Sequence, residues 1–164
     1  MADMLIKLYT LSDCTVLVKR LEDSGINIRR ALVPEKHIVV QWVLKHFSAH
    51  WASECETAFS SHPVSCFIAT FEGKAAGFTC YDVTCKGVIG PIGVREDMRG
   101  KGIGKALLIS SLHDMAHQGY AYAIVGDVGT EEFFSSVAGA SVIKGSEPGI
   151  YRGMLRENSH DEGA

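Results

Sequence analysis

The seven residues from Arg99 to Lys105, Arg-Gly-Lys-Gly-Ile-Gly-Lys, combine three glycines with three cations. Glycine has no Cβ, so the backbone can turn tightly there and a ligand can approach it closely. If a helix begins directly after this turn, its first N–H groups have no acceptor within the helix and point out of its end. Together with the helix dipole and the cations, these donors favour an anion, and we predict a pyrophosphate site. The alternative, a tight turn shaped by glycines alone, leaves the cations unexplained.

The spacing of the glycines distinguishes between kinds of phosphate loop. A Walker A loop needs a glycine five residues before its Gly-Lys pair, but position 95 is Arg95 and Lys101 is followed by another glycine. A dinucleotide-binding loop needs Gly-x-Gly-x-x-Gly, and here the third glycine comes one residue too soon. The pattern that fits is Arg-x-x-Gly-x-Gly, formed by Arg99, Gly102 and Gly104.

Strands and helices must position this loop. The apolar run 88–94 predicts a strand that enters the loop, and the apolar spacing over 106–117 predicts a long helix that leaves it. Upstream, we expect a short strand near Leu5 and a helix that ends at Gly25. Two further helices are expected later, the first opening at Pro34 and containing Trp42, the second containing Trp51. A helix over 131–137, with Thr130 as its cap, follows later. Strands are expected at 26–32, 64–70, 75–81, 87–94 and 120–125, with a final strand pair at 141–143 and 150–155.

From about residue 26 to 155, the loop and this order of elements resemble the GNAT superfamily of acyl-CoA-dependent N-acyltransferases. The resemblance implies an α/β fold with a mixed, mostly antiparallel central sheet flanked by helices. The acyl-CoA loop would lie between the fourth strand and the long helix. It also implies a division into an N-terminal extension packed on the domain (1–25), an acyltransferase domain (26–155) and a flexible tail (156–164).

The same resemblance implies where the cofactor binds. In the family, the strand before the loop and the strand after the long helix splay apart, and the pantetheine arm lies between them. Backbone groups of Ile92, Gly93 and Val94 would hold the pantetheine and the acetyl carbonyl. Asp127 ends the fifth strand and would either cap the next helix or meet the cofactor. The pyrophosphate would be held by the loop residues Arg99, Gly100, Lys101, Gly102, Ile103, Gly104 and Lys105.

One position departs from the family pattern. The helix after the fifth strand commonly reads Asn-x-x-Ala-x-x-Phe-Tyr, and the last position here is Phe134. The tyrosine hydroxyl that often protonates the departing thiolate is therefore absent, although the Phe134 ring would still lie beside the cofactor. Tyr151 is the candidate replacement acid, and a structural tyrosine is the competing interpretation. Glu54 and Glu56 follow Trp51 in the second helix, where family members often contact the acceptor. The competing interpretation, which we favour, is a solvated helix face.

These features predict an N-acetyltransferase that uses acetyl-CoA as co-substrate and transfers the acetyl group by direct attack of an amine. The acceptor would be a small molecule or a peptide amine, and the resemblance allows a homodimer. The alternative is a sensor or accessory domain that binds CoA or acyl-CoA without turnover. Phe134 motivates that alternative, because it offers no proton.

Composition limits the other function classes. The chain has 164 residues, 46% hydrophobic and 21% charged, with a net charge of −3, which indicates one soluble domain and argues against nucleic acid as a partner. It shows neither a signal peptide nor an apolar run that could span a membrane, so we expect no membrane partner. Five cysteines without a Cys-x-x-Cys pair predict free thiols in the cytoplasm. His113 and His117 have zinc-ligand spacing but no evident third ligand, so we predict no metal.

Overall fold

The computed structural model describes residues 1–156; residues 157–164, nearly all of the expected tail, lie outside the described part of the chain. The chain alternates short strands with helices. The strands are β1 (Met4–Lys7), β2 (Ile26–Arg30), β3 (Cys66–Phe71), β4 (Lys74–Tyr81), β5 (Ile89–Val94), β6 (Tyr122–Val125) and β7 (Ser141–Val142). The helices are α1 (Thr15–Asp23), α2 (Lys36–His46), α3 (Ala49–Ala58), α4 (Ile103–His117) and α5 (Glu131–Ala138), with short 3-10 turns at Leu8–Thr10, Val33–Glu35 and Glu96–Met98.

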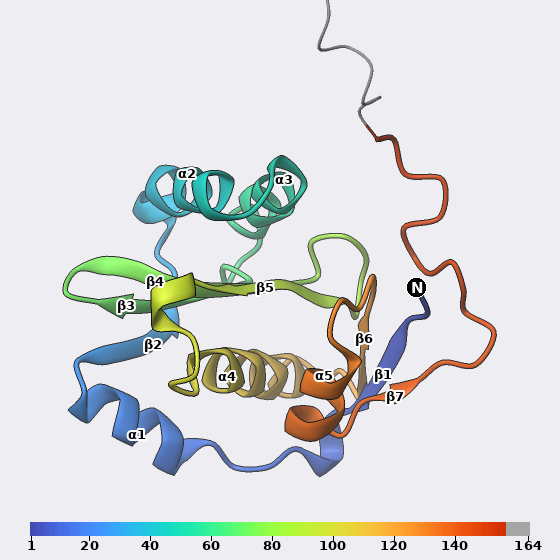
Figure 1. Cartoon of the computed structure of the whole chain (residues 1–164), viewed down its shortest axis with the longest axis horizontal. Helices are drawn as coiled ribbons and strands as arrows, with labels where there is room; N and C mark the ends of the chain where they lie inside the picture. The colour runs from blue at the N-terminus through green and yellow to red at the C-terminus, as the bar shows by residue number, and fades with distance from the viewer. Residues whose placement is uncertain (157–164) are drawn as a thin grey trace, which may run out of the picture.

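Two sheets form the centre of the fold. The larger is antiparallel with strand order β2-β3-β4-β5, and the smaller has the order β6-β1-β7. Helices α2 and α3 cover one face of the larger sheet, and α1 and α4 lie against the other face (Figure 1). The expected α/β fold, with a mostly antiparallel sheet and flanking helices, is confirmed.

Helix α4 lies between the two sheets. It contacts β3, β4 and β5 of the larger sheet and β6 of the smaller one. Eight of its fifteen residues are buried, and all of these except Ser111 are apolar. The apolar sequence of α4 therefore explains its central position, which brings the glycine-rich loop at its N-terminus to the junction of the sheets.

The strands expected at 64–70 and 75–81 are β3 and β4, and they form a hairpin. Phe71 pairs with Lys74, so the turn contains only Glu72 and Gly73. Both residues have positive φ angles, 49° and 72°, as a type I′ hairpin turn requires. The turn sets the pairing next to it, and an irregularity between Ala69 and Thr70 then shifts the register by one residue along the rest of the two strands.

The prediction of a final strand pair at 141–143 and 150–155 is wrong. The strand β7 ends at Val142, and residues 150–155 form turns and irregular backbone instead of a strand. The strand β1 lies between β6 and β7 and is antiparallel to both; Met4 is the pairing partner of Val125 on one side and of Val142 on the other. The N-terminal segment thus supplies the central strand of the smaller sheet. Its two inward side chains, Met4 and Ile6, are almost completely buried.

This arrangement makes a prediction about stability. Ile6→Ala should lower the free energy of unfolding by about 2–5 kcal/mol, because it leaves a cavity at a fully buried position. The matched change Lys7→Ala, at the exposed end of the same strand, should cost less than about 0.5 kcal/mol. Chemical denaturation of both variants measures the difference. Equal values for the two would show that β1 does not belong to the folded core.

Within residues 1–156, no helix combines the length and the hydrophobicity that a membrane-spanning segment needs.

Candidate functional site

A cleft opens where the two sheets meet. Strands β5 and β6 are joined by a single parallel bridge, Val88 with Ile124, and the Ile124 N–H donates to the Gly87 carbonyl at 2.8 Å. Beyond this bridge β5 pairs only with β4, and β6 pairs only with β1. The cleft between them has a volume of about 1650 Å³, whereas a typical single-ligand pocket has about 300–1,000 Å³. It is therefore larger than a typical pocket for one small ligand.

The glycine-rich loop closes one end of this cleft. Gly100 and Gly102 have positive φ angles of 78° and 90°, so the turn uses the conformational freedom of glycine. The first hydrogen bond of α4 runs from the Ala106 N–H to the Gly102 carbonyl at 3.0 Å. The N–H groups of 103–105 therefore have no acceptor within the helix. An anion at the helix end would satisfy them.

The structure brings nearly all of the predicted site residues together. Of the predicted residues, those that line the cleft are Ile92, Gly93, Val94, Arg99, Gly100, Gly102, Ile103, Gly104, Lys105, Asp127, Phe134 and Tyr151. Lys101 does not line it; it borders a smaller cavity next to Arg20 of α1. Arg99 is exposed, and its Nε donates to the Val94 carbonyl at 3.1 Å, which ties the loop to the end of β5.

Two glycines of the loop face different surroundings. Gly102 lines the cleft with its backbone, but a Cβ added there would point to α1 and lie 2.9 Å from Cδ1 of Leu17. A Cβ on Gly104 would lie 3.6 Å from Phe133 and from Val94, which is an ordinary contact distance. Both of these neighbours line the cleft. A larger side chain at position 104 would therefore occupy cleft space without displacing the core.

A second polar cluster lines the same cleft. The Tyr151 hydroxyl donates to Oε1 of Glu54 at 2.7 Å, and the Thr84 hydroxyl donates to the same oxygen at 2.5 Å. These residues come from α3, from the loop between β4 and β5, and from the C-terminal segment. The expectation of a solvated face for Glu54 is wrong, because its carboxylate is partly buried and accepts two hydrogen bonds. Glu56 does lie on such a face and pairs with Lys36 at 3.0 Å.

The environment of Tyr151 keeps its hydroxyl protonated. Burial raises the pKa of Tyr151 to about 12, and the negative charges of Glu54 and Asp127 act in the same direction. At neutral pH the side chain is therefore a hydrogen-bond donor. A proton donor and a structural tyrosine, whose buried hydroxyl also needs a partner, are both consistent with this hydrogen bond.

The N-terminus positions the segment that carries Tyr151. The carboxylate of Asp3, which is only 6% exposed, accepts a hydrogen bond from the Ile150 N–H at 3.2 Å. The Asp3 N–H in turn donates to the Ser146 hydroxyl at 2.8 Å. Ile150 also packs closely on Gly126, where a Cβ would come within 2.5 Å of its side chain. Asp3 is a positioning residue that no local pattern in the sequence reveals.

Aromatic side chains form the wall next to Glu54. Phe47 and Trp51 line the cleft, and their ring centroids are 5.2 Å apart. The Phe47 ring lies directly against the backbone of Gly93, where a Cβ would be 2.5 Å from its Cζ. Aromatic faces beside a carboxylate favour a cationic group. The wall therefore suits a protonated amine.

The remaining candidate residues are engaged elsewhere. Phe134 is 7% exposed and packs with Phe133 at a centroid distance of 5.1 Å, so its ring belongs to the core as well as to the cleft wall. Helix α5 begins after Thr130 as expected, but neither Asp127 nor Thr130 caps it with a side-chain hydrogen bond. The His113 ring shares a hydrogen bond with the Ser12 carbonyl at 3.0 Å, which occupies its Nε2.

Comparisons with known proteins agree with this geometry. The sequence profile of the acetyltransferase (GNAT) family matches residues 34–135. Among solved structures, the chain is similar to a GCN5-related glucosamine N-acetyltransferase region of a fungal multi-domain β-N-acetylglucosaminidase, with a TM-score of 0.69 and 16% identity. It is also similar to a GCN5-related N-acetyltransferase from Sphaerobacter thermophilus, with a TM-score of 0.66 and 20% identity. Each alignment covers 87% of this chain.

The chain spans 19% of the length of the fungal protein chain and 48% of that from Sphaerobacter thermophilus. At such low sequence identity, the two structural similarities show only that the fold is shared. No curated protein matches the chain significantly.

Proposed function

Because the chain belongs to the GNAT family of acetyltransferases, we propose that it transfers the acetyl group of acetyl-CoA to an amine bound at the Glu54 end of the cleft. One observation carries this proposal. A single cleft joins a helix N-terminus with free N–H donors to a partly buried carboxylate beside an aromatic wall. The first end suits a pyrophosphate and the second suits an ammonium group.

The chain offers matching groups for each part of acetyl-CoA, which supplies the activated thioester. The N–H groups of 103–105 and the exposed cations Arg99 and Lys105 would hold the pyrophosphate. Beyond the bridge at Val88, the edge of β5 that faces β6 is unpaired. Apart from the Val94 carbonyl, which accepts from Arg99, the backbone groups of 92–94 on this edge are thus available to pair with the pantetheine amides, as an added strand would.

Glu54 is the proposed general base. An amine acceptor has a pKa of roughly 10 and is protonated at neutral pH, so it must lose a proton before it can attack. The Glu54 carboxylate attracts the ammonium group and takes this proton, directly or through one water molecule. A backbone N–H of β5 stabilises the oxyanion that forms when the amine attacks the thioester carbonyl.

Tyr151 is the proposed proton relay to the leaving sulfur. With its pKa raised to about 12, the phenol alone is a weaker acid than a thiol with a pKa near 8.5. It can nevertheless pass on the proton that Glu54 has taken, because the two groups are hydrogen-bonded at 2.7 Å. The proton removed from the amine then ends on the CoA sulfur. This route compensates for the phenylalanine at position 134.

The acceptor class follows from the same end of the cleft. Glu54, Phe47 and Trp51 favour a primary amine of a small molecule or of a peptide. The five free cysteines suit a reducing compartment, and we propose the cytoplasm.

The release of CoA thiol tests this proposal. The purified chain should release thiol from acetyl-CoA in the presence of at least one member of a panel of primary amines, and an acetylated product of equal amount should form. Omission of the amine should leave only slow hydrolysis. Tight CoA binding in calorimetry without release on any amine would contradict the proposal and support the sensor without turnover.

A further inference from the structure

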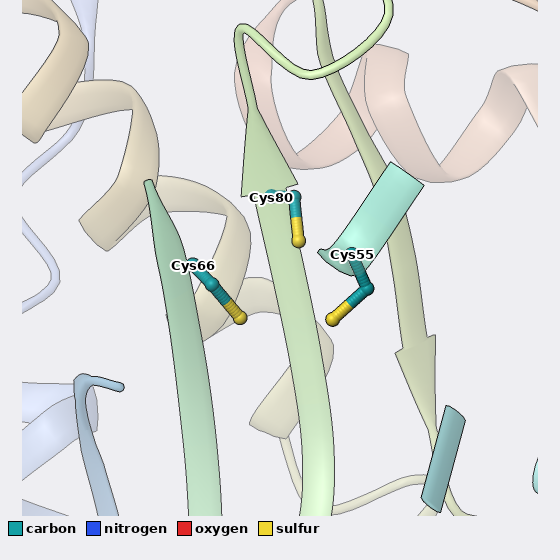
Figure 2. Close-up of side chains that lie close together, drawn as sticks. All are labelled: Cys55, Cys66 and Cys80. Atoms are coloured by element: carbon teal, nitrogen blue, oxygen red, sulfur yellow. The ribbon is translucent and has the colours of Figure 1, made fainter. Parts of the chain in front are cut away.

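Three cysteines that lie far apart in the sequence meet in the core beneath α3. Cys66 and Cys80 are direct pairing partners on β3 and β4, and Cys55 comes down from α3. Figure 2 shows the three side chains with their sulfur atoms pointing toward one another. All three Sγ atoms lie within 4.8 Å of one another, and each residue is 0% exposed. The reaction proposed above uses none of them.

The spacing of the sulfur atoms is close to that of a three-thiolate ion site. Soft ions such as zinc form bonds to sulfur of about 2.3 Å, so three sulfur ligands of one ion lie about 3.8–4.0 Å apart. The sulfur atoms therefore need to move by at most about 1 Å, which rotation of the cysteine side chains can supply. Three thiolates are ligands for soft, thiophilic ions and not for magnesium or calcium.

The surroundings limit the charge that such a site can carry. The neighbours in this part of the core are apolar, among them Val43, Ala52 and Val64. A buried net charge without a partner is costly. A complex of three thiolates with a monovalent ion has a net charge of two negative units, and the complex with a divalent ion has one. Only a trivalent ion gives a neutral complex.

The three thiols differ in pKa. Hydrogen bonds from Cys66 and Cys80 lower the pKa of Cys55 to about 5, whereas burial raises the pKa of Cys80. Ionisation of Cys55 is thus easier than that of the other two thiols. The carboxylates of Glu35 and Glu56, which oppose ionisation of Cys66 and Cys55 respectively, add negative charge nearby and further disfavour an anionic complex.

We propose that Cys55, Cys66 and Cys80 form a binding site for a trivalent thiophilic ion, with arsenite as its test ligand. Arsenous acid and three thiols give one arsenic tris-thiolate and three water molecules. No electron is transferred. Three As–O bonds and three S–H bonds are broken, three As–S bonds and three O–H bonds form, and the core carries no net charge before or after the step. Because Cys55 lies on the helix that brings Trp51 and Glu54 to the cleft, a bound ion also ties that helix to β3 and β4.

The test uses the full chain, reduced with a thiol-free phosphine. Native mass spectrometry should show one arsenic per chain, with three hydrogens lost, and the Tm should rise with arsenite concentration. The double variant Cys14→Ser/Cys85→Ser, which keeps the cluster, should behave like the wild type. Cys55→Ala should bind arsenite at least tenfold more weakly.

Three results would overturn the proposal. The first is a wild-type chain that neither forms the one-to-one adduct nor gains thermal stability, a result that does not depend on any variant folding. The second is a Cys55→Ala chain with native circular dichroism and wild-type affinity for arsenite. The third is a larger rise in Tm with zinc than with arsenite at equal concentration, which would assign the cluster to a divalent ion.

Discussion

The Gly104→Val variant is expected to fold normally and to bind CoA about 100-fold or more weakly, a loss of about 2.8 kcal/mol. A Cβ at this position makes only ordinary contacts with Phe133 and Val94, so the core need not move. The two additional methyl groups would enter the space at the N-terminus of α4 where the pyrophosphate must approach the free N–H groups. Calorimetric titration with CoA measures the affinity, and circular dichroism establishes that the variant is folded.

Gly104→Ala is the matched control for this loss. Its single methyl group lies 3.6 Å from both neighbours, and its affinity for CoA should fall between those of the wild type and the valine variant. Gly102 is unsuitable for the same test, because its φ of 90° and the 2.9 Å approach to Leu17 would strain the fold itself. A folded Gly104→Val chain that binds CoA within threefold of the wild type would exclude the helix end as the phosphate site.

The second large effect is expected at Glu54. Glu54→Gln should lower kcat/KM by about 100-fold or more while leaving CoA affinity unchanged, because an amide cannot take a proton from the acceptor. The glutamine can still accept the hydrogen bonds from Tyr151 and Thr84, so the cluster should stay in place. Initial rates of thiol release with a saturating amine, together with CoA titration, separate the chemical step from cofactor binding.

Two further variants locate the origin of this effect. Glu56→Gln removes a carboxylate from the same helix but from its exposed face, and it should leave the rate unchanged. Tyr151→Phe should lower the rate tenfold or more, about 1.4 kcal/mol, if the phenol relays the proton to sulfur. Wild-type rates in a folded Glu54→Gln chain would remove Glu54 from the mechanism. A loss in Glu56→Gln as large as that in Glu54→Gln would indicate a general charge effect.

The loop and its flanking elements could be predicted because their signals are local. Glycines at fixed spacing, an apolar strand before them and an apolar helix after them are properties of one continuous segment, 88–117. The hairpin at Glu72 and Gly73 is local in the same sense. The cleft was expected only from the family resemblance; the strand that leads into the loop and the loop itself form one wall of it.

Long-range pairing could not be predicted in the same way. The four residues of β1 resemble any short strand, and their partners at 122–125 and 141–142 lie more than a hundred positions away. The role of Glu54 depends on a tyrosine 97 residues later, and the cysteine cluster depends on three separate elements. For Glu54, one signal was available: it lies three positions after Trp51 and so shares its side of α3.

The most direct test of the central claim is a map of the backbone amide shifts in the ¹⁵N NMR spectrum as CoA is added. We expect saturable one-to-one changes centred on the amides of Gly93, Val94 and 103–105, with smaller changes at 126–128 across the cleft. The surface of α2, on the outer face of the larger sheet, should remain unaffected. Changes confined to that surface, or none at saturating CoA, would show that the cleft between β5 and β6 is not the cofactor site.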